Sequence, residues 1–388
     1  MRAQTLFFFL LSVSCASAST TTPQGDAGAD AAPVVTKSLG MSDVSVLWPL
    51  PASPAAPGTL GPESAGAKGT LLPQAVYDKV PAFGVKPAQG LDYARMRVVA
   101  TRFDGCFSKP SGCEAQIRLV MQPITDDGST LDSALHLFYT LTETELTTVV
   151  AELRRMRTLA PEVKDAPLDV HAGLAAQGLE GAYGKALRDL VLAHAGEENL
   201  TRMTFFLRAP PRQEEWFLGG VERVDGVFKT LDIVGVGKAN QRVNRPVTGE
   251  GYTYTFTPEA MTPEDIGVLL DSEKAKAATP EARSQALSAF ARIENPNRYG
   301  PDQLPCAGCH VSTFVTEATR VGFGLAIDTM PDAFKSQRDL TRRGEAASTP
   351  SSLRAFGYFD KTPMIGSRVV HESAVVVDDL EKRFPMKK

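Results

Sequence analysis

The sequence predicts an α+β fold, with an N-terminal domain built on a largely antiparallel sheet and a mostly α-helical C-terminal domain. Two patterns predict it. Between residues 96 and 236, several segments alternate apolar and polar residues in the manner of strands. Beyond Pro258 the pattern changes to helix-start signals followed by helical spacing of apolar residues. The order strands, helix, helix, strands favours an antiparallel sheet over a parallel βαβ array.

Alternation defines the strands of the N-terminal domain. The expected strands are 44–48, 97–103, 116–121, 135–139, 202–208, 215–223 and 227–236. A helix is expected to begin at Thr142, because Thr142 and Glu145 form a capping-box pattern. The apolar residues that then recur on one helical face are Leu146, Val149, Val150, Leu153 and Met156. A second helix is expected over residues 184–194.

Proline marks two helix starts in the C-terminal domain. Thr262-Pro263-Glu264-Asp265 and Thr279-Pro280-Glu281 both place Pro in the first turn, where its missing N–H costs nothing. The second of these helices is expected to run from residue 280 to 293. A final helix is expected over 367–384, although its run Val375-Val376-Val377 would also suit a strand. We place the two domains at residues 41–257 and 258–388.

The first residues have the form of an export signal. A positive residue, Arg2, precedes the apolar run 6–11 and a series of small residues. This run is shorter than the about 20 apolar residues that a membrane-spanning helix needs. Cleavage is expected after Ala18, or just before Cys15 in the manner of a bacterial lipoprotein signal, which would give a lipidated Cys15 and a membrane tether. Residues 19–40 are expected to be a disordered linker.

Charge and cysteine usage narrow the function classes. Lys and Arg (41) nearly balance Asp and Glu (45), without a basic stripe, so nucleic acid is not expected as a partner. Besides Cys15, the cysteines form two close pairs, Cys106 with Cys113 and Cys306 with Cys309, which is typical of an oxidising compartment. The first pair flanks a turn-forming stretch between expected strands and predicts a disulfide. We expect an exported protein, periplasmic or anchored to the outer membrane as a lipoprotein.

The second pair belongs to the segment Cys306-Ala307-Gly308-Cys309-His310. A haem c is held by thioether bonds from two cysteines to its vinyl groups, and the histidine beside the second cysteine binds its iron. Ala307 and Gly308 are small, so the backbone can approach the porphyrin edge. Two other interpretations stay open: a disulfide beside an incidental histidine, and a structural zinc site with three of its four ligands.

On this motif, residues 279–384 resemble the cytochrome c family, particularly single-haem members in which the motif precedes a methionine and a final helix. The resemblance implies a cytochrome c-like domain that carries haem c. It also implies that the iron ligands are His310 and Met364. Met364 lies in Thr362-Pro363-Met364-Ile365-Gly366, a loop expected just ahead of the last helix. Nothing in the N-terminal domain resembles a family known to us.

Other side chains compete with Met364 for the sixth position on the iron. They are Met330, in Asp328-Thr329-Met330-Pro331, and His371, and an open position is a further alternative. With both positions filled, the iron can exchange one electron with little rearrangement, whereas an open position would permit peroxide chemistry. The remaining histidines, His136, His171 and His194, are isolated in sequence and are expected at the surface or in the core.

The leading hypothesis is an exported monohaem c-type cytochrome that transfers one electron to or from an unidentified redox protein. In that case it is an electron carrier without catalytic residues. One alternative is a haem-dependent peroxidase-like or oxidase-like enzyme with an open iron site. The other is a haem-free, disulfide-stabilised binding or scaffold lipoprotein of the cell envelope.

Overall fold

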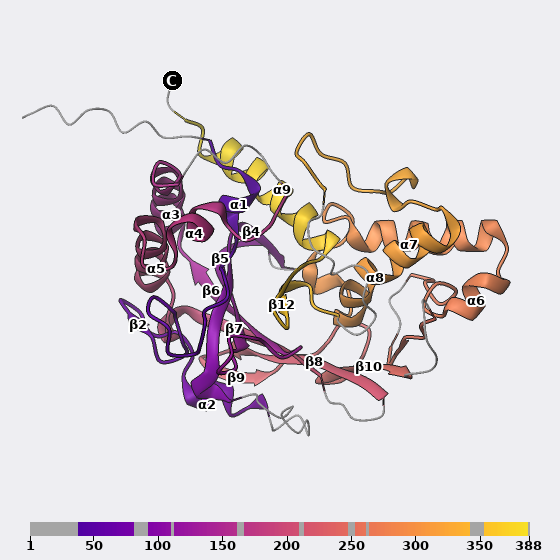
Figure 1. Cartoon of the computed structure of the whole chain (residues 1–388), viewed down its shortest axis with the longest axis horizontal. Helices are drawn as coiled ribbons and strands as arrows, with labels where there is room; N and C mark the ends of the chain where they lie inside the picture. The colour runs from indigo at the N-terminus through magenta and orange to yellow at the C-terminus, as the bar shows by residue number, and fades with distance from the viewer. Residues whose placement is uncertain are drawn as a thin grey trace, which may run out of the picture. The chain divides into compact units, whose positions relative to one another are not determined.

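Alternating apolar residues build one large antiparallel sheet, so the mixed α+β class is confirmed (Figure 1). The computed structural model describes residues 38–80, 92–109, 112–160, 167–208, 213–246, 253–260, 264–341 and 353–386. The predicted signal segment, Cys15 and most of the predicted linker lie outside these ranges. Within them, no helix combines the length and apolar character needed to cross a membrane.

The sheet has nine strands within the described ranges, in the order β1-β4-β5-β6-β7-β8-β10-β11, with β9 paired to β8. Their bounds are Ser45–Leu47 (β1), Met96–Lys109 (β4), Gly112–Pro123 (β5), Ala134–Leu141 (β6), Leu200–Arg208 (β7), Gln213–Val224 (β8), Val227–Thr230 (β9), Asn240–Pro246 (β10) and Thr257–Pro258 (β11). The prediction of a strand over 227–236 was too long. That strand ends at Thr230, and a turn follows at residues 234–236, where Gly235 and the next glycine, Gly237, have positive φ.

Of the N-terminal helices, α3 and α5 were predicted from the sequence, and α1, α2 and α4 were not. Their bounds are Met41–Val44 (α1), Gln74–Tyr77 (α2), Glu143–Met156 (α3), Ala172–Gln177 (α4) and Ala182–His194 (α5), beside a small hairpin of Ala65–Gly66 (β2) and Gly69–Thr70 (β3). The capping box is present: Thr142 Oγ1 accepts from the Glu145 N–H at 3.3 Å, and Glu145 Oε2 accepts from the Thr142 N–H at 2.8 Å. The predicted apolar face of α3 is buried.

The C-terminal segment is mostly helical, with one hairpin. Its elements are Ser272–Ala277 (α6), Pro280–Glu294 (α7), Cys306–Phe323 (α8), Phe356–Phe359 (β12), Thr362–Ile365 (β13) and Ser367–Arg383 (α9). Helix α7 begins as predicted, with Thr279 Oγ1 accepting from the Ala282 N–H. Helix α9 confirms the predicted final helix, and its valine run is helical.

Two local predictions were wrong. The helix expected from Thr262-Pro263 does not form in the described residues that follow, 264–270, which are bends and turns. There Arg292 and Tyr299 bind the Glu264 carboxylate at 2.6 Å and hold the segment along α7. Met364 lies in strand β13, not in a loop, because this strand pairs with β12 and places Met364 opposite Gly357.

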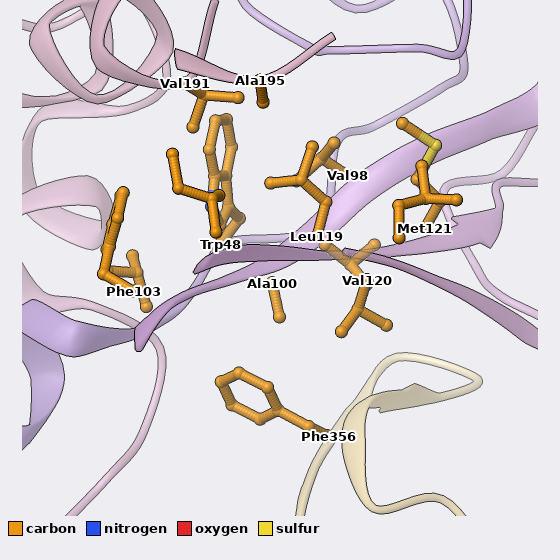
Figure 2. Packing of buried hydrophobic residues seen from close by; sticks show 14 of the residues in the cluster. Trp48, Val98, Ala100, Phe103, Leu119, Val120, Met121, Val191, Ala195 and Phe356 are labelled. Atoms are coloured by element: carbon orange, nitrogen blue, oxygen red, sulfur yellow. The ribbon is translucent and has the colours of Figure 1, made fainter. Parts of the chain in front are cut away.

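The two faces of the sheet differ in composition. Leu119, Leu137 and Met203 lie opposite one another on adjacent strands and form part of an apolar face. It packs in one core with side chains of α3 and α5. In Figure 2, Leu119 points toward Trp48 and Val191, whereas Val120 points the other way, toward Phe356.

The opposite surface is named here the polar face, and its defining residues are Arg102, Arg118, His136, Arg202 and Thr204. Helix α9 covers it at β4, where Arg102 binds Glu372 at 2.6 Å. The β12–β13 hairpin covers β5, where Gln122 exchanges two hydrogen bonds with the Tyr358 backbone. Helix α8 packs against β8 and β10.

Residues from both predicted domains share one core. Trp48 and Phe103 belong to the same apolar cluster as Val370 and Leu380 of α9. The boundary at residues 257 and 258 stays a prediction.

Near one end of α9, Cys106 and Cys113 lie at disulfide-bonding distance across the β4–β5 hairpin, as expected.

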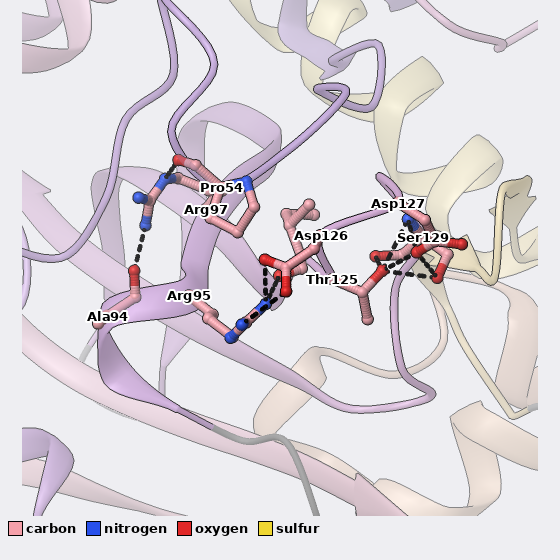
Figure 3. Close-up of polar contacts among 9 residues, drawn as sticks. Pro54, Ala94, Arg95, Arg97, Thr125, Asp126, Asp127 and Ser129 are labelled. Atoms are coloured by element: carbon pink, nitrogen blue, oxygen red, sulfur yellow. Dashed lines mark hydrogen bonds and ion pairs between the residues drawn. The ribbon is translucent and has the colours of Figure 1, made fainter.

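The turn between β5 and β6 is held by local polar contacts (Figure 3). Arg95 binds the Asp126 carboxylate through both terminal nitrogens, at 2.9 and 3.1 Å. Asp127 accepts from the hydroxyl groups of Thr125 and Ser129. The hydrogen bonds from Thr125 and Ser129 lower the pKa of Asp127 to about 2. The turn therefore keeps an ionised carboxylate at its tip.

Candidate functional site

The Cys-x-x-Cys-His segment forms the first turn and a half of α8. The helix follows Pro305, and its apolar residues Val311, Phe314 and Val315 pack into the core. It ends at Gly324, whose φ of +67° suits glycine. The first N–H groups of a helix need acceptors from outside the helix, and Gln241 Oε1 on β10 accepts from the Ala307 N–H at 2.9 Å. The sheet thereby anchors the motif.

Cys306 and Cys309 are free thiols in this structure and are half-buried. Burial raises the pKa of Cys306 to about 12 and that of Cys309 to about 11. Both groups are therefore protonated thiols at neutral pH, not thiolates. One helical turn presents them together with His310.

The His310 imidazole is held in a defined orientation. Its Nδ1 lies 2.7 Å from the Leu353 carbonyl oxygen, so the tautomer that satisfies this contact carries its proton on Nδ1. The ring stacks on Phe206 of β7, with centroids 4.9 Å apart and planes 8° from parallel. Burial lowers the pKa of His310 to about 4, which keeps it neutral. Nε2 therefore retains the lone pair with which a neutral imidazole binds a metal.

A cavity of about 470 Å³ lies between Cys306 and the polar face. Its walls include Arg118, Phe138, Arg202 and Thr204. Arg202 is bound by Asp302 at 2.6 Å and by Glu222 at 3.1 Å. This volume lies within the range of about 300–1,000 Å³ that small-molecule and cofactor sites occupy.

His136 and Arg354 lie beside this site, although their positions in the chain do not group them with the motif. His136 is paired with Thr204 across β6 and β7, on the same face as Phe206. Burial, followed by the charges of Arg354, Arg118 and His310, lowers the pKa of His136 well below its ordinary value. The Arg354 guanidinium lies 4.4 Å from the Phe206 ring centroid and 3.6 Å from Asp132.

Met364 is buried, with 1% of its surface exposed. The first residue of α9, which follows its hairpin, is tied to α8, because the Ser367 N–H donates to Thr313 Oγ1 at 2.9 Å and Thr313 lies one turn beyond His310. On the paired strand, Gly357 abuts Gln122 and Arg354. Met364 thus belongs to the hairpin that lies next to the motif helix.

The two other candidates for the sixth iron ligand, Met330 and His371, have different neighbours. The Ser288 hydroxyl on α7 donates to the sulfur of Met330 at 3.2 Å. His371 Nδ1 lies 2.9 Å from the Glu294 carbonyl oxygen, and its ring packs on Phe334. Both contacts are made with α7 or with the loop that follows α8. Met330 and the two motif cysteines pack against the same apolar cluster, which includes Phe206, so the described contacts do not select Met364 over Met330.

Of the other histidines, His171 is a satisfied core residue, as expected. It caps α4 by accepting from the Gly173 N–H at 3.1 Å, and it stacks on Tyr183 with a centroid distance of 4.1 Å. Among the described residues, no three His, Cys, Asp or Glu side chains are grouped so as to hold a metal ion between them.

The donor set fits a haem c. Two thiols three residues apart and an adjacent imidazole with its Nε2 lone pair retained are the donors that such a group requires, and the cavity of about 470 Å³ borders Cys306 but neither Cys309 nor His310. No protein-family model, curated protein or solved structure matches this chain. The functional argument therefore depends on the site itself.

Proposed function

We propose that the chain is a monohaem c-type cytochrome that transfers single electrons. Cys306 and Cys309 would hold the haem through thioether bonds, and His310 would bind its iron. The observation that carries the proposal is the orientation of His310. Its Nδ1 contact with the Leu353 carbonyl leaves Nε2 as the ligand atom, on the same helical turn as two free thiols.

When bound, the haem supplies the one-electron chemistry. The chain's own residues orient and shield the site. The Leu353 carbonyl and the Phe206 ring restrict rotation of the His310 imidazole. Arg354 closes over Phe206, with none of its side chain exposed to solvent. Fixed ligands reduce the rearrangement that accompanies each electron transfer, which suits a carrier.

The N-terminal α+β region would then position the cofactor. Its sheet contributes Arg118, Phe138, Arg202 and Thr204 to the wall beside Cys306. The C-terminal segment would be the cytochrome c-like part, and Met364 the sixth ligand that the resemblance implies. Export to the periplasm, or anchoring to the outer membrane through Cys15, and a redox protein as partner belong to the same proposal.

Haem attachment is the first test. The full chain is expressed in a host with a cytochrome maturation system, and covalent haem is stained on a denaturing gel. We expect a stained band that is lost in the double variant Cys306→Ala/Cys309→Ala. The matched control, Cys106→Ser/Cys113→Ser, is expected to keep the stain. A colourless wild-type protein would refute the proposal.

Ligand variants test the sixth position. In Met364→Ala, we expect loss of the absorption band that methionine gives with ferric iron, with the haem retained. Met330→Ala should leave that band in place. The reverse result would assign the position to Met330. Rapid binding of carbon monoxide to the ferrous wild-type protein would mean that the position is open and would favour the peroxidase-like or oxidase-like alternative.

A further inference from the structure

A buried arginine, Arg354, lies beside the proposed iron ligand. Its guanidinium carbon is 4.4 Å from the centroid of the Phe206 ring, and the His310 imidazole stacks on the same ring with a centroid distance of 4.9 Å. The residue before Arg354 supplies the carbonyl oxygen that lies 2.7 Å from His310 Nδ1. The arginine therefore adjoins His310 both along the chain and through a shared aromatic neighbour.

Arg354 carries a positive charge where water does not reach it. None of its side chain is exposed. Burial lowers the pKa of Arg354 to about 10, against the opposing charge of Asp132, so the guanidinium is still protonated at neutral pH. A charge without nearby water is screened little and acts more strongly on its surroundings than a surface charge does.

Asp132 is the counter-charge of this arginine, and 1% of its side chain is exposed. Its Oδ1 lies 3.6 Å from Arg354 Nη2, which is longer than a hydrogen bond. The other oxygen, Oδ2, accepts from Trp216 Nε1 at 2.9 Å, and this contact fixes the carboxylate. A buried ion pair adds little net stability over apolar packing. Stability alone therefore does not account for the pair.

The charge of Arg354 acts beyond its own contacts. Burial lowers the pKa of His136, on β6, well below its ordinary value, and Arg354 is the charge that adds most to this lowering. An iron bound to His310 would stand in the same field. When ferric iron takes one electron from a redox protein, its positive charge falls by one. A fixed positive charge therefore favours the reduced form, and a fixed negative charge favours the oxidised form.

We propose that the buried charge of Arg354 raises the reduction potential of the haem iron and that Asp132 moderates this effect. The pair then tunes electron transfer without binding the iron. This inference rests on the proposed function and deepens it, because it assigns the energetics of that same site to two residues outside the Cys-x-x-Cys-His motif. It predicts opposite effects for the two charges.

The test measures the reduction potential of four haem-loaded full chains: wild type, Arg354→Met, Asp132→Asn and the double variant. Each is titrated with redox mediators, and the ferrous haem is followed by its absorption. We expect Arg354→Met to lower the potential and Asp132→Asn to raise it. Each shift should be at least about tenfold in the ferrous-to-ferric ratio at a fixed ambient potential, or about 59 mV for one electron. The double variant, which is neutral at both positions, should lie between the two single variants.

The opposite signs separate charge from structure, because a loosened His310 ring would shift the potential in one direction whichever partner is removed. Arg354→Lys keeps the charge and should stay closer to wild type than Arg354→Met does. Asp132→Asn keeps an oxygen for Trp216 and gives the sign test alone if Arg354→Met does not fold. Lys276→Met, which removes a charge whose side chain is 58% exposed on α6, should leave the potential unchanged.

Covalent haem staining distinguishes the two possible failures. Stained variants with unchanged potentials, or with shifts of the same sign, would overturn this inference and leave the proposed function intact. A colourless wild-type protein would overturn both.

Discussion

The two faces of the central sheet are built from the same strands but have different physical character. On the apolar face, Leu119, Leu137 and Met203 pack with helices in an apolar core. On the polar face, Arg118, His136 and Arg202 lie beneath the C-terminal elements. Burying such groups costs free energy unless each is paired. The difference indicates that the apolar face stabilises the fold, whereas the polar face carries buried charged groups beside the proposed site.

Ion pairs at the edge of the polar face show how the free-energy cost of burying its charged groups is offset. Glu372 of α9 binds Arg102 of β4 at 2.6 Å and Arg368 of its own helix at 2.6 Å. Such a buried set adds little net stability over apolar packing, but removing one member is costly. The polar face therefore depends on complete sets of partners, in contrast to the apolar face.

The largest expected effect is on the apolar face. Replacing Phe103 by Ala should lower the free energy of unfolding by about 3–5 kcal/mol, because it leaves a cavity where a ring is 1% exposed. Urea denaturation measures this change. If the apolar face is only structural, the absorption spectrum of the haem-loaded variant should match that of wild type at urea concentrations too low to unfold either protein. A changed spectrum would weaken the contrast between the faces.

The second-largest change in the free energy of unfolding is expected for Glu372. Glu372→Gln should cost about 3 kcal/mol, because two buried guanidinium groups lose their shared carboxylate. Burial alone would raise the pKa of Glu372, but Arg102 and Arg368 lower it from 4.5 to about 2. This stabilisation is complete above the unfolded pKa and is lost as the pH falls toward the folded one.

The difference in unfolding free energy between wild type and Glu372→Gln should therefore be larger at about pH 7 than at about pH 3. Urea titrations at both values measure it. The control is Glu273→Gln in the exposed pair with Lys276, which should change stability by no more than about 0.5 kcal/mol. A pH-independent effect of Glu372→Gln would show that the carboxylate contributes by shape and not by charge.

A smaller effect is expected when two neighbouring residues of β7, which lie on opposite faces of the sheet, are compared. Phe206→Leu should cost about 1.5 kcal/mol and loosen the His310 ring, which stacks on Phe206. The electron paramagnetic resonance spectrum and reduction potential of the haem-loaded protein should shift. Phe205→Leu, one residue away on the apolar face, should cost a similar amount without that shift. Equal shifts in the two variants would contradict the assignment.

The smallest effect lies outside both faces. Thr142→Ala removes the N-cap of α3 and should lower the free energy of unfolding by about 1 kcal/mol. Thermal denaturation measures this loss. Thr148→Ala, a hydroxyl change on the exposed side of the same helix, is the control and should have a smaller effect. If the control costs as much, the cap is not the cause.

Local patterns predicted much of this fold. Alternation located the long strands, and caps located α3 and α7, because these signals depend on neighbouring residues. Strand β10 and the β12–β13 hairpin were not predicted, since short strands form only where a distant strand accepts them. Met364 was placed in a loop for this reason.

The residues of the candidate site also divide into those that the sequence predicts and those that only the fold brings together. Cys306, Cys309 and His310 form a contiguous motif, so the sequence alone identified them. His136, Phe206 and Arg354 come from three distant segments, and only the register of β6 with β7 and the packing of α8 bring them near His310. Chain positions alone contain no signal for that proximity.

The hydrogen bond from the Ala307 backbone to Gln241 has a consequence for the order of assembly. Every strand of the nine-stranded sheet precedes residue 306 in the chain. Since synthesis runs from the N-terminus, β10 and the strands of the cavity wall can already be paired when the two thiols emerge from the ribosome. The motif can then dock onto paired strands before α9 covers the same face, and an enzyme that attaches a cofactor would meet it at a defined place.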